Sequence, residues 1–184
     1  MNFTDIDLAS RALNLIGARE ISSLDEGSAE AQAAAGIYPL VKRRLISSFT
    51  WSFARKSERL NRLDGEGACG YIARFALPPD FIRAVGISPR VEYKIAGGEL
   101  VCNASAVELD YIADVGAEGF SPMFVSALVS ALAAEFSLCL LDDGTKFNTL
   151  QRRAMLELKE ARLCESQQES PKRIASFPLS NARK

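Results

Sequence analysis

The stretch Ser121–Leu141, SPMFVSALVSALAAEFSLCLL, carries the strongest structural signal in the chain. From Met123 to Leu141 it contains a single charged residue, Glu135, and it is long enough to span a membrane. However, three serines interrupt this segment, two aspartates follow it, and no Lys or Arg lies closer than Lys146 to orient it in a bilayer. Because a helix that is apolar on all sides is also expected at the centre of a helical bundle, we favour that interpretation.

Helical periodicity extends outward from this segment in both directions. A first helix is expected from Thr4 to Gly17, where Thr4 and an aspartate three residues later form a capping-box pattern. A second helix follows Ser28 and continues to Ile46, with a kink or break near Pro39. The central helix starts at Pro122 behind the N-cap Ser121, and a last helix runs from Thr145 to about Gln168.

The middle of the chain changes to a shorter period that is typical of strands. Five runs fit this pattern: Tyr71–Leu77, Phe81–Ile87, Val91–Ile95, Leu100–Cys102 and Val107–Ile112. A tight hairpin is expected at Ala96-Gly97-Gly98-Glu99. The sequence therefore predicts a mainly α (α+β) fold: a four-helix bundle with an inserted small antiparallel β-sheet and an extended C-terminal tail. Its expected parts are a helical bundle (1–63 and 121–170), a β-rich subdomain (64–120) and a basic arm (171–184).

Histidine is absent from the 184 residues, which removes the usual general base and the commonest zinc ligand. The glycine-rich segment Gly65–Gly70 lacks the lysine of a phosphate-binding loop, and the acidic pairs lack the spacing of a calcium loop. We therefore expect no catalytic residues, no cofactor and no metal, and we assign the acidic pairs to helix capping. The four cysteines show no CxxC spacing and are expected to be reduced and mostly buried.

Charge is distributed unevenly along the chain. The last 14 residues, Pro171 to Lys184, carry four basic and no acidic residues, so the overall charge of −1 leaves −5 for residues 1–170. Fully extended, this arm spans roughly 46 Å at about 3.3 Å per residue, which is enough to reach a neighbouring molecule. Lys42, Arg43 and Arg44 at the end of the second helix are better explained as a solvated basic face near the helix dipole than as a binding patch.

Several short motifs occur in a definite order. They are Ala12-Leu13-Asn14-Leu15-Ile16-Gly17, then Tyr38 and Arg44-Leu45-Ile46, then Trp51-Ser52-Phe53-Ala54, then Phe75-Ala76-Leu77-Pro78-Pro79-Asp80. This set resembles the head-to-tail adaptor, or tail tubular protein A, family of short-tailed phages and of phage-like particles such as gene transfer agents. Near the C-terminus, where family members often carry a Trp and an Arg, this chain has Phe177 and Ala182-Arg183-Lys184.

The resemblance implies a structural protein of the virion neck, made in the cytoplasm of a bacterial host, with no enzymatic activity. It implies a ring, typically a dodecamer, that binds the portal protein, surrounds the DNA exit channel and offers its other face to the next tail component, a nozzle, stopper or tail tube protein. Double-stranded DNA would pass without sequence-specific binding, and no membrane is involved. The acidic body fits such a channel, since binding to phosphates uses a strongly positive surface.

The resemblance and the residues together suggest two sets of positions. The motif residues Trp51, Phe53, Ala54, Leu77, Pro78 and Asp80 are expected to be structural, with Trp51 and Phe53 joining bundle to sheet. The expected partner-binding residues lie in the C-terminal arm: Lys172, Arg173, Phe177, Arg183 and Lys184. A frayed C-terminus is the alternative for this arm.

Two other functions remain open at this stage. One is a small cytoplasmic helical domain for dimerisation or regulation, which would use the helix from Met123 to Leu141. The other is a histidine-free hydrolase that depends on the carboxylates of Asp80 or Asp110.

Overall fold

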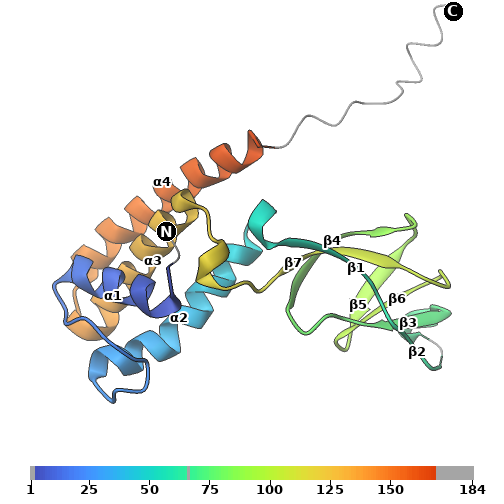
Figure 1. The fold of residues 1–184 in the computed structure, drawn as a ribbon, viewed down its shortest axis with the longest axis horizontal. Coiled ribbons are helices and arrows are strands. Elements are labelled where there is room, and N and C mark those ends of the chain that lie inside the picture. Colours follow the sequence, from blue (N-terminus) through green and yellow to red (C-terminus); the bar gives the residue numbers. More distant parts are fainter. Residues whose placement is uncertain (1–2, 66, 169–184) are drawn as a thin grey trace, which may run out of the picture.

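The computed structural model describes residues 3–65 and 67–168, which form a helical part and a β part arranged side by side (Figure 1). The helical part contains α1 (Asp5–Ile16), α2 (Ala29–Ser47), α3 (Pro122–Leu141) and α4 (Gly144–Ser166). The β part contains seven strands, and three short 3-10 helices, η1 (Ser52–Ala54), η2 (Ala68–Gly70) and η3 (Ala117–Gly119), lie in the connections.

Local sequence signals account for the helix ends. Thr4 and Asp7 form the expected capping box at the start of α1, and Gly17 ends that helix in the left-handed conformation, with φ of 80°. Ser121 caps α3, with Pro122 in its first turn, and the Asp143 side chain accepts a hydrogen bond from the Lys146 amide at the start of α4. The predicted capping roles of Asp7 and Asp143 are therefore confirmed.

The predicted break in the second helix is wrong. α2 runs unbroken from Ala29 to Ser47 with Pro39 inside it. Pro39 provides no amide for the carbonyl of Ala35, one turn earlier, but both residues are exposed, so water can satisfy that carbonyl. The helix therefore tolerates the proline because the lost hydrogen bond lies on its solvent-exposed face.

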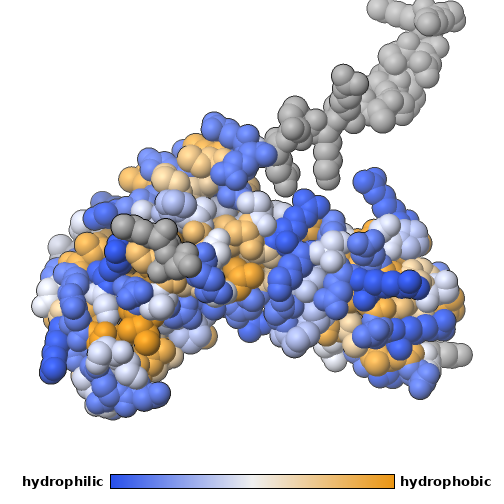
Figure 2. All heavy atoms as spheres, in the orientation of Figure 1, coloured by the Kyte–Doolittle hydropathy of each residue, from blue (hydrophilic) through white to orange (hydrophobic). Residues whose placement is uncertain are grey.

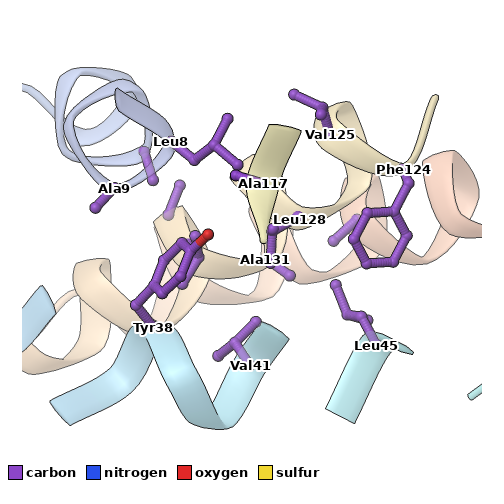
Figure 3. Close-up of a cluster of buried hydrophobic side chains, with 14 of the residues drawn as sticks. Leu8, Ala9, Tyr38, Val41, Leu45, Ala117, Phe124, Val125, Leu128 and Ala131 are labelled. Carbon is purple, nitrogen blue, oxygen red and sulfur yellow. The ribbon is translucent and has the colours of Figure 1, made fainter. Parts of the chain in front are cut away.

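α3 is the centre of the helical part. Eleven of its 20 residues are buried, and α1, α2 and α4 all pack against it. Figure 3 shows the resulting core, with Leu8 of α1 and Val41 of α2 pointing toward Leu128 of α3. The helix passes the length and hydropathy test for a membrane span, but 61% of its most apolar window is buried within the fold.

This arrangement corrects the predicted fold class. The four helices do not form a clear four-helix bundle, because α1, α2 and α4 contact α3 much more than they contact one another. The apolar surface all around α3 lets it serve as a shared partner, so the outer helices need not complete a closed bundle. The fold is α+β, with four α-helices and two antiparallel sheets among the described residues.

The β part has two sheets where the sequence predicts one. The first is ordered β1 (Arg55–Arg59), β7 (Glu108–Ala113) and β4 (Phe81–Ser88). The second is ordered β2 (Arg62–Leu63), β3 (Ala73–Ala76), β6 (Glu99–Cys102) and β5 (Tyr93–Ala96). The predicted hairpin is confirmed between β5 and β6, where Gly97 and Gly98 both have positive φ.

Strands β1 and β2 were not predicted, and they lie before residue 64, in the segment that the sequence assigns to the helical bundle. β1 has the sequence Arg-Lys-Ser-Glu-Arg and is exposed along most of its length, so no alternation of apolar residues marks it. It forms by pairing with β7, where Arg55 lies opposite Ile112. A second hydrophobic cluster, including Phe75, Leu100 and Leu109, fills the β part.

The expectation of mostly buried cysteines is wrong for the side chains that the structure describes. Cys102 is buried in β6, whereas Cys139 and Cys164 are exposed on α3 and α4. Both exposed residues lie near the ends of their helices, where fewer neighbouring elements cover the surface.

Candidate interaction surface

The motif residues around Trp51 form an aromatic cluster where the helical part meets β1. Trp51 is completely buried and donates a hydrogen bond from Nε1 to the carbonyl oxygen of Leu45, 3.1 Å away. Its ring lies 5.0 Å from that of Phe124 and 5.7 Å from that of Phe53, measured between centroids. Ala54 is also buried in this cluster. Trp51 therefore packs the segment that leads into β1 onto α2 and α3, and has no surface with which to contact a partner.

Asp80 forms a polar cluster at the start of β4, next to the buried Pro78 and the partly buried Leu77. Its carboxylate accepts hydrogen bonds from Lys56 Nζ at 2.6 Å and from the Tyr111 hydroxyl at 3.0 Å. Burial opposes ionisation of Asp80, but these two hydrogen bonds outweigh it and hold its pKa below the ordinary value.

The same cluster affects Tyr111 in the opposite direction. Burial, the hydrogen bond to Asp80 and the nearby negative charges raise the pKa of the Tyr111 hydroxyl. Asp110, the other carboxylate considered for hydrolysis, pairs with Arg55 at 3.0 Å. Because both aspartates are held in ion pairs, the arrangement favours a structural role, and the lowered pKa of Asp80 is the opposite of what a general acid needs.

Arg43 and Arg44 are exposed, as the sequence predicts, whereas Lys42 is mostly covered, and all three make contacts with other elements. Lys42 pairs with Asp114 at 2.9 Å, Arg43 donates to the carbonyl oxygen of Phe81, and Arg44 pairs with Glu135 of α3. These cations therefore connect the end of α2 to β4, to the segment after β7 and to α3.

Arg83 of β4 completes this connection from the other side. It donates from Nε to the carbonyl oxygen of Ser47 and from Nη2 to the hydroxyl of Thr50. It thus satisfies one of the free carbonyls at the C-terminal end of α2. The helical part and the β part are held together by these contacts as well as by the aromatic cluster.

A hollow with a volume of about 640 Å³ lies over the sheet of β1, β7 and β4. Four of its polar side chains already pair with one another: Arg55 with Asp110, and Ser57 with Glu108. This hollow therefore offers few unsatisfied groups to a ligand.

On the side away from α3, α4 exposes leucines that alternate with basic residues. We call Arg152, Leu156, Lys159 and Leu163 the α4 outer face; these residues recur at helical spacing and are all exposed. Leu156 and Leu163 are 64% and 56% exposed, and Met155 beside them is 60% exposed. Figure 2 shows apolar surface along α4 at the upper edge of the helical part, bordered by hydrophilic residues.

Two grooves flank α4 because it packs on α3 with little contact to α1 or α2. The groove toward α1 holds about 320 Å³ and is lined by Leu15, Val129 and Arg153, among others. The groove toward α2 holds about 260 Å³, with Ala131 of α3 and Met155 in its lining. Together with the α4 outer face they leave much of α4 uncovered by the rest of the helical part.

The sequence does not single out this surface. The apolar stripe that predicts the last helix, which includes Leu150, Ala154 and Ala161, is the one that faces α3. Leu156 and Leu163, spaced two helical turns apart on the opposite side, were the available signal. The predicted partner-binding residues Lys172, Arg173, Phe177, Arg183 and Lys184 lie outside the described residues.

No protein-family model matches this chain, and no curated protein matches its sequence.

Proposed function

We propose that this chain is a structural head-to-tail connector of a phage or phage-like particle. It forms a ring under the portal, links the portal to the next tail component and surrounds the DNA exit channel. The ordered motifs from Ala12 to Asp80 support this proposal, and the proposed ring is a dodecamer. The protein would be made in a bacterial cytoplasm and would act in the virion neck, without catalysis.

The observation that carries the proposal is the exposure of Met155, Leu156 and Leu163 on α4, beside two grooves. Soluble monomers rarely expose large contiguous apolar patches, and such patches are typical of protein–protein contacts. A ring subunit needs contact surfaces toward its neighbours, and α4 offers one that its own fold leaves uncovered.

Charge supports the same function. Residues 1–170 carry a net charge of −5, and the C-terminal segment 171–184 carries +4. An acidic ring would let DNA pass with few phosphate contacts. We assign the contact with the portal to the basic segment, through Lys172, Arg173, Phe177, Arg183 and Lys184.

The alternative is a small cytoplasmic dimerisation or regulatory domain that uses α3. This alternative is less favoured because α1, α2 and α4 all pack on α3, so most of the helix is already covered. A stable dimer that does not bind portal protein would nevertheless support the dimerisation domain.

The test is binding to the cognate portal. We expect the purified full chain to join portal rings with cyclic stoichiometry in native mass spectrometry. Replacing the four basic residues of segment 171–184 by serine should weaken portal binding, whereas replacing four exposed basic residues of the β part by serine serves as a charge-matched control: Arg59, Arg62, Arg90 and Lys94. A chain that binds no portal ring, encoded away from virion genes, would overturn the proposal.

A further inference from the structure

We infer that the α4 outer face of one copy docks on the outer face of α2 of the next copy, in a head-to-tail contact that repeats around the ring. The α2 outer face consists of Ala29, Gln32, Gly36, Leu40 and Arg43. This inference deepens the proposed function and rests on its ring.

The α2 outer face is suited to receive protruding side chains. Its residues recur at helical spacing and are all exposed, and Leu40, at 71%, is the most exposed large hydrophobic residue among those described. At Gly36, no atom lies within 4 Å of the position that a Cβ would take. Together with Ala29, this glycine leaves a shallow surface on which another helix can approach closely.

The α4 outer face provides the protruding side chains. Leu156 and Leu163 are exposed and lie two helical turns apart. Lys159 lies between them on the same face, and Arg152 lies one turn before Leu156. Large apolar side chains packed against the small residues and the leucine of the α2 outer face would bury exposed hydrophobic surface of both helices, with Gln32 and Arg43 at the polar positions of that face. Each face thus supplies what the other lacks.

The start of α2 and the helix α4 carry opposite charges, whereas the basic residues of α2, Lys42 to Arg44, lie at its other end. Residues 20–30, which lead into α2, contain four acidic and no basic residues: Glu20, Asp25, Glu26 and Glu30. α4 contains five basic and three acidic residues. Hydrogen bonds from the Ser28 hydroxyl and the Ser22 amide lower the pKa of Glu26 to about 2, so it stays ionised at neutral pH. The opposite signs favour contact between α4 and the start of α2.

The same charges argue against a contact between two α4 helices. A symmetric pairing of α4 outer faces would gather two copies each of Arg152 and Lys159 in one contact, with no acidic residue of the face to pair with them, and like charges repel. α2 and α4 both pack on α3 and present their outer faces away from it. Because the two faces differ and point in different directions, a dimer joined by this contact still has one unused α2 face and one unused α4 face. Further copies can add to these faces, and the chain of copies closes into a ring when the rotation between neighbours brings the last copy back to the first.

The experiment uses two single-face variants of the full chain, Leu156→Glu and Leu40→Glu, with Ile72→Glu as the control. Ile72 is 61% exposed but belongs to the β part. Self-association is measured by sedimentation velocity over a concentration series. We expect each single-face variant to weaken self-association by at least about tenfold and the control to behave as wild type.

Mixing the two single-face variants tests the head-to-tail geometry. In the mixture, the intact α2 face of Leu156→Glu can bind the intact α4 face of Leu40→Glu. We therefore expect dimers that do not grow further, while each variant alone stays monomeric. Assembly by Leu40→Glu as strong as that of wild type would overturn the inference, and so would a wild-type chain that stays monomeric at its highest soluble concentration. Circular dichroism checks folding, and Leu156→Ser and Leu40→Ser repeat the test if a glutamate variant is misfolded.

Portal binding separates this inference from the proposed function. If the chain binds the portal but Leu156→Glu and Leu40→Glu leave its self-association unchanged, the α4–α2 contact is refuted and the connector function is not. Loss of portal binding in wild type would refute the connector function, whatever the state of self-association.

Discussion

In the helical part, three helices share one apolar partner, α3, and the core is made of side chains from all four helices. In the β part, short strands with exposed charged residues are aligned by cross-strand pairs such as Arg55–Asp110 and Arg74–Glu99. Packing against a single central helix organises the first part, whereas strand pairing between distant segments organises the second. The contacts around Trp51, Lys42 and Arg83 join the two.

The largest effect is expected at the aromatic cluster that joins the parts. Trp51→Ala removes a completely buried side chain and its hydrogen bond to Leu45, and should destabilise the protein by about 3–5 kcal/mol. Urea unfolding followed by circular dichroism measures this loss, because the substitution also removes the single tryptophan. Trp51→Phe should cost less, and Ile72→Ala, at an exposed site, should stay within about 0.5 kcal/mol. A loss below 1 kcal/mol for Trp51→Ala would show that the buried ring and its hydrogen bond contribute little to stability.

A pair of core substitutions tests whether the two parts are separate in stability. Leu128 of α3 and Leu100 of β6 are both fully buried, each in its own cluster, and replacing either by Ala should cost about 2–5 kcal/mol. Hydrogen exchange should show lost protection mainly in α1–α4 for Leu128→Ala and mainly in β3, β5 and β6 for Leu100→Ala. Equal loss of protection across both parts for both variants would mean that they unfold as one unit.

A smaller and pH-dependent effect is expected at Asp80. Asp80→Asn weakens the contacts with Lys56 and Tyr111 and should cost about 1 kcal/mol at neutral pH. The pKa of Asp80 is lowered in the folded protein, so its carboxylate contributes its full stability above its ordinary pKa of 3.8. That contribution is lost as the pH falls below 3.8 through the folded-state pKa.

Urea unfolding of wild type and Asp80→Asn as a function of pH measures this difference. The gap between them should narrow under acidic conditions, whereas Asp64→Asn, at an exposed position, should match wild type throughout. A gap that widens as the pH falls would contradict the lowered pKa of Asp80.

The smallest effect is expected on the surface of α4. Arg153 and Glu157 form an i,i+4 ion pair at 2.8 Å, and Arg153→Gln should cost about 0.3–0.5 kcal/mol at low salt. Thermal unfolding at low and high salt measures this loss, which should shrink as salt screens the pair. Arg152→Gln on the α4 outer face is the matched control and should have less effect. A larger loss that is insensitive to salt would indicate that Arg153 contributes through packing instead.

Much of the helical part could be predicted because its signals are local. Thr4, Ser28 and Ser121 mark helix starts within a few residues of the segments they cap, and Gly97-Gly98 marks a turn between adjacent strands. Pro39 is the exception, because it does not break α2. Whether a proline breaks a helix depends on whether water can reach the carbonyl that it leaves without a partner, and this requires knowing which face of α2 is exposed.

The candidate site was harder to predict than the helices. The motifs allowed a structural role for Trp51 and Asp80 to be predicted. They did not show that Asp80 pairs with Lys56 and Tyr111, because these residues lie 24 and 31 positions away along the chain. The α4 outer face was missed because any amphipathic helix has one stripe that packs inward, and sequence spacing alone does not show that a second stripe stays uncovered.

By itself, the sequence determined the limits of α1, α3 and α4, the β5–β6 hairpin and the central position of the apolar helix. These features depend on hydrogen bonds and side-chain periodicity within short windows of the chain. Tertiary structure alone decided that the strands form two sheets, that α3 is a shared partner without a clear bundle, and that Lys42 and Arg43 connect the two parts. The physical reason is distance along the chain: β1 exists because Arg55 pairs opposite Ile112, and the free energy of that pairing comes from residues that no local pattern connects.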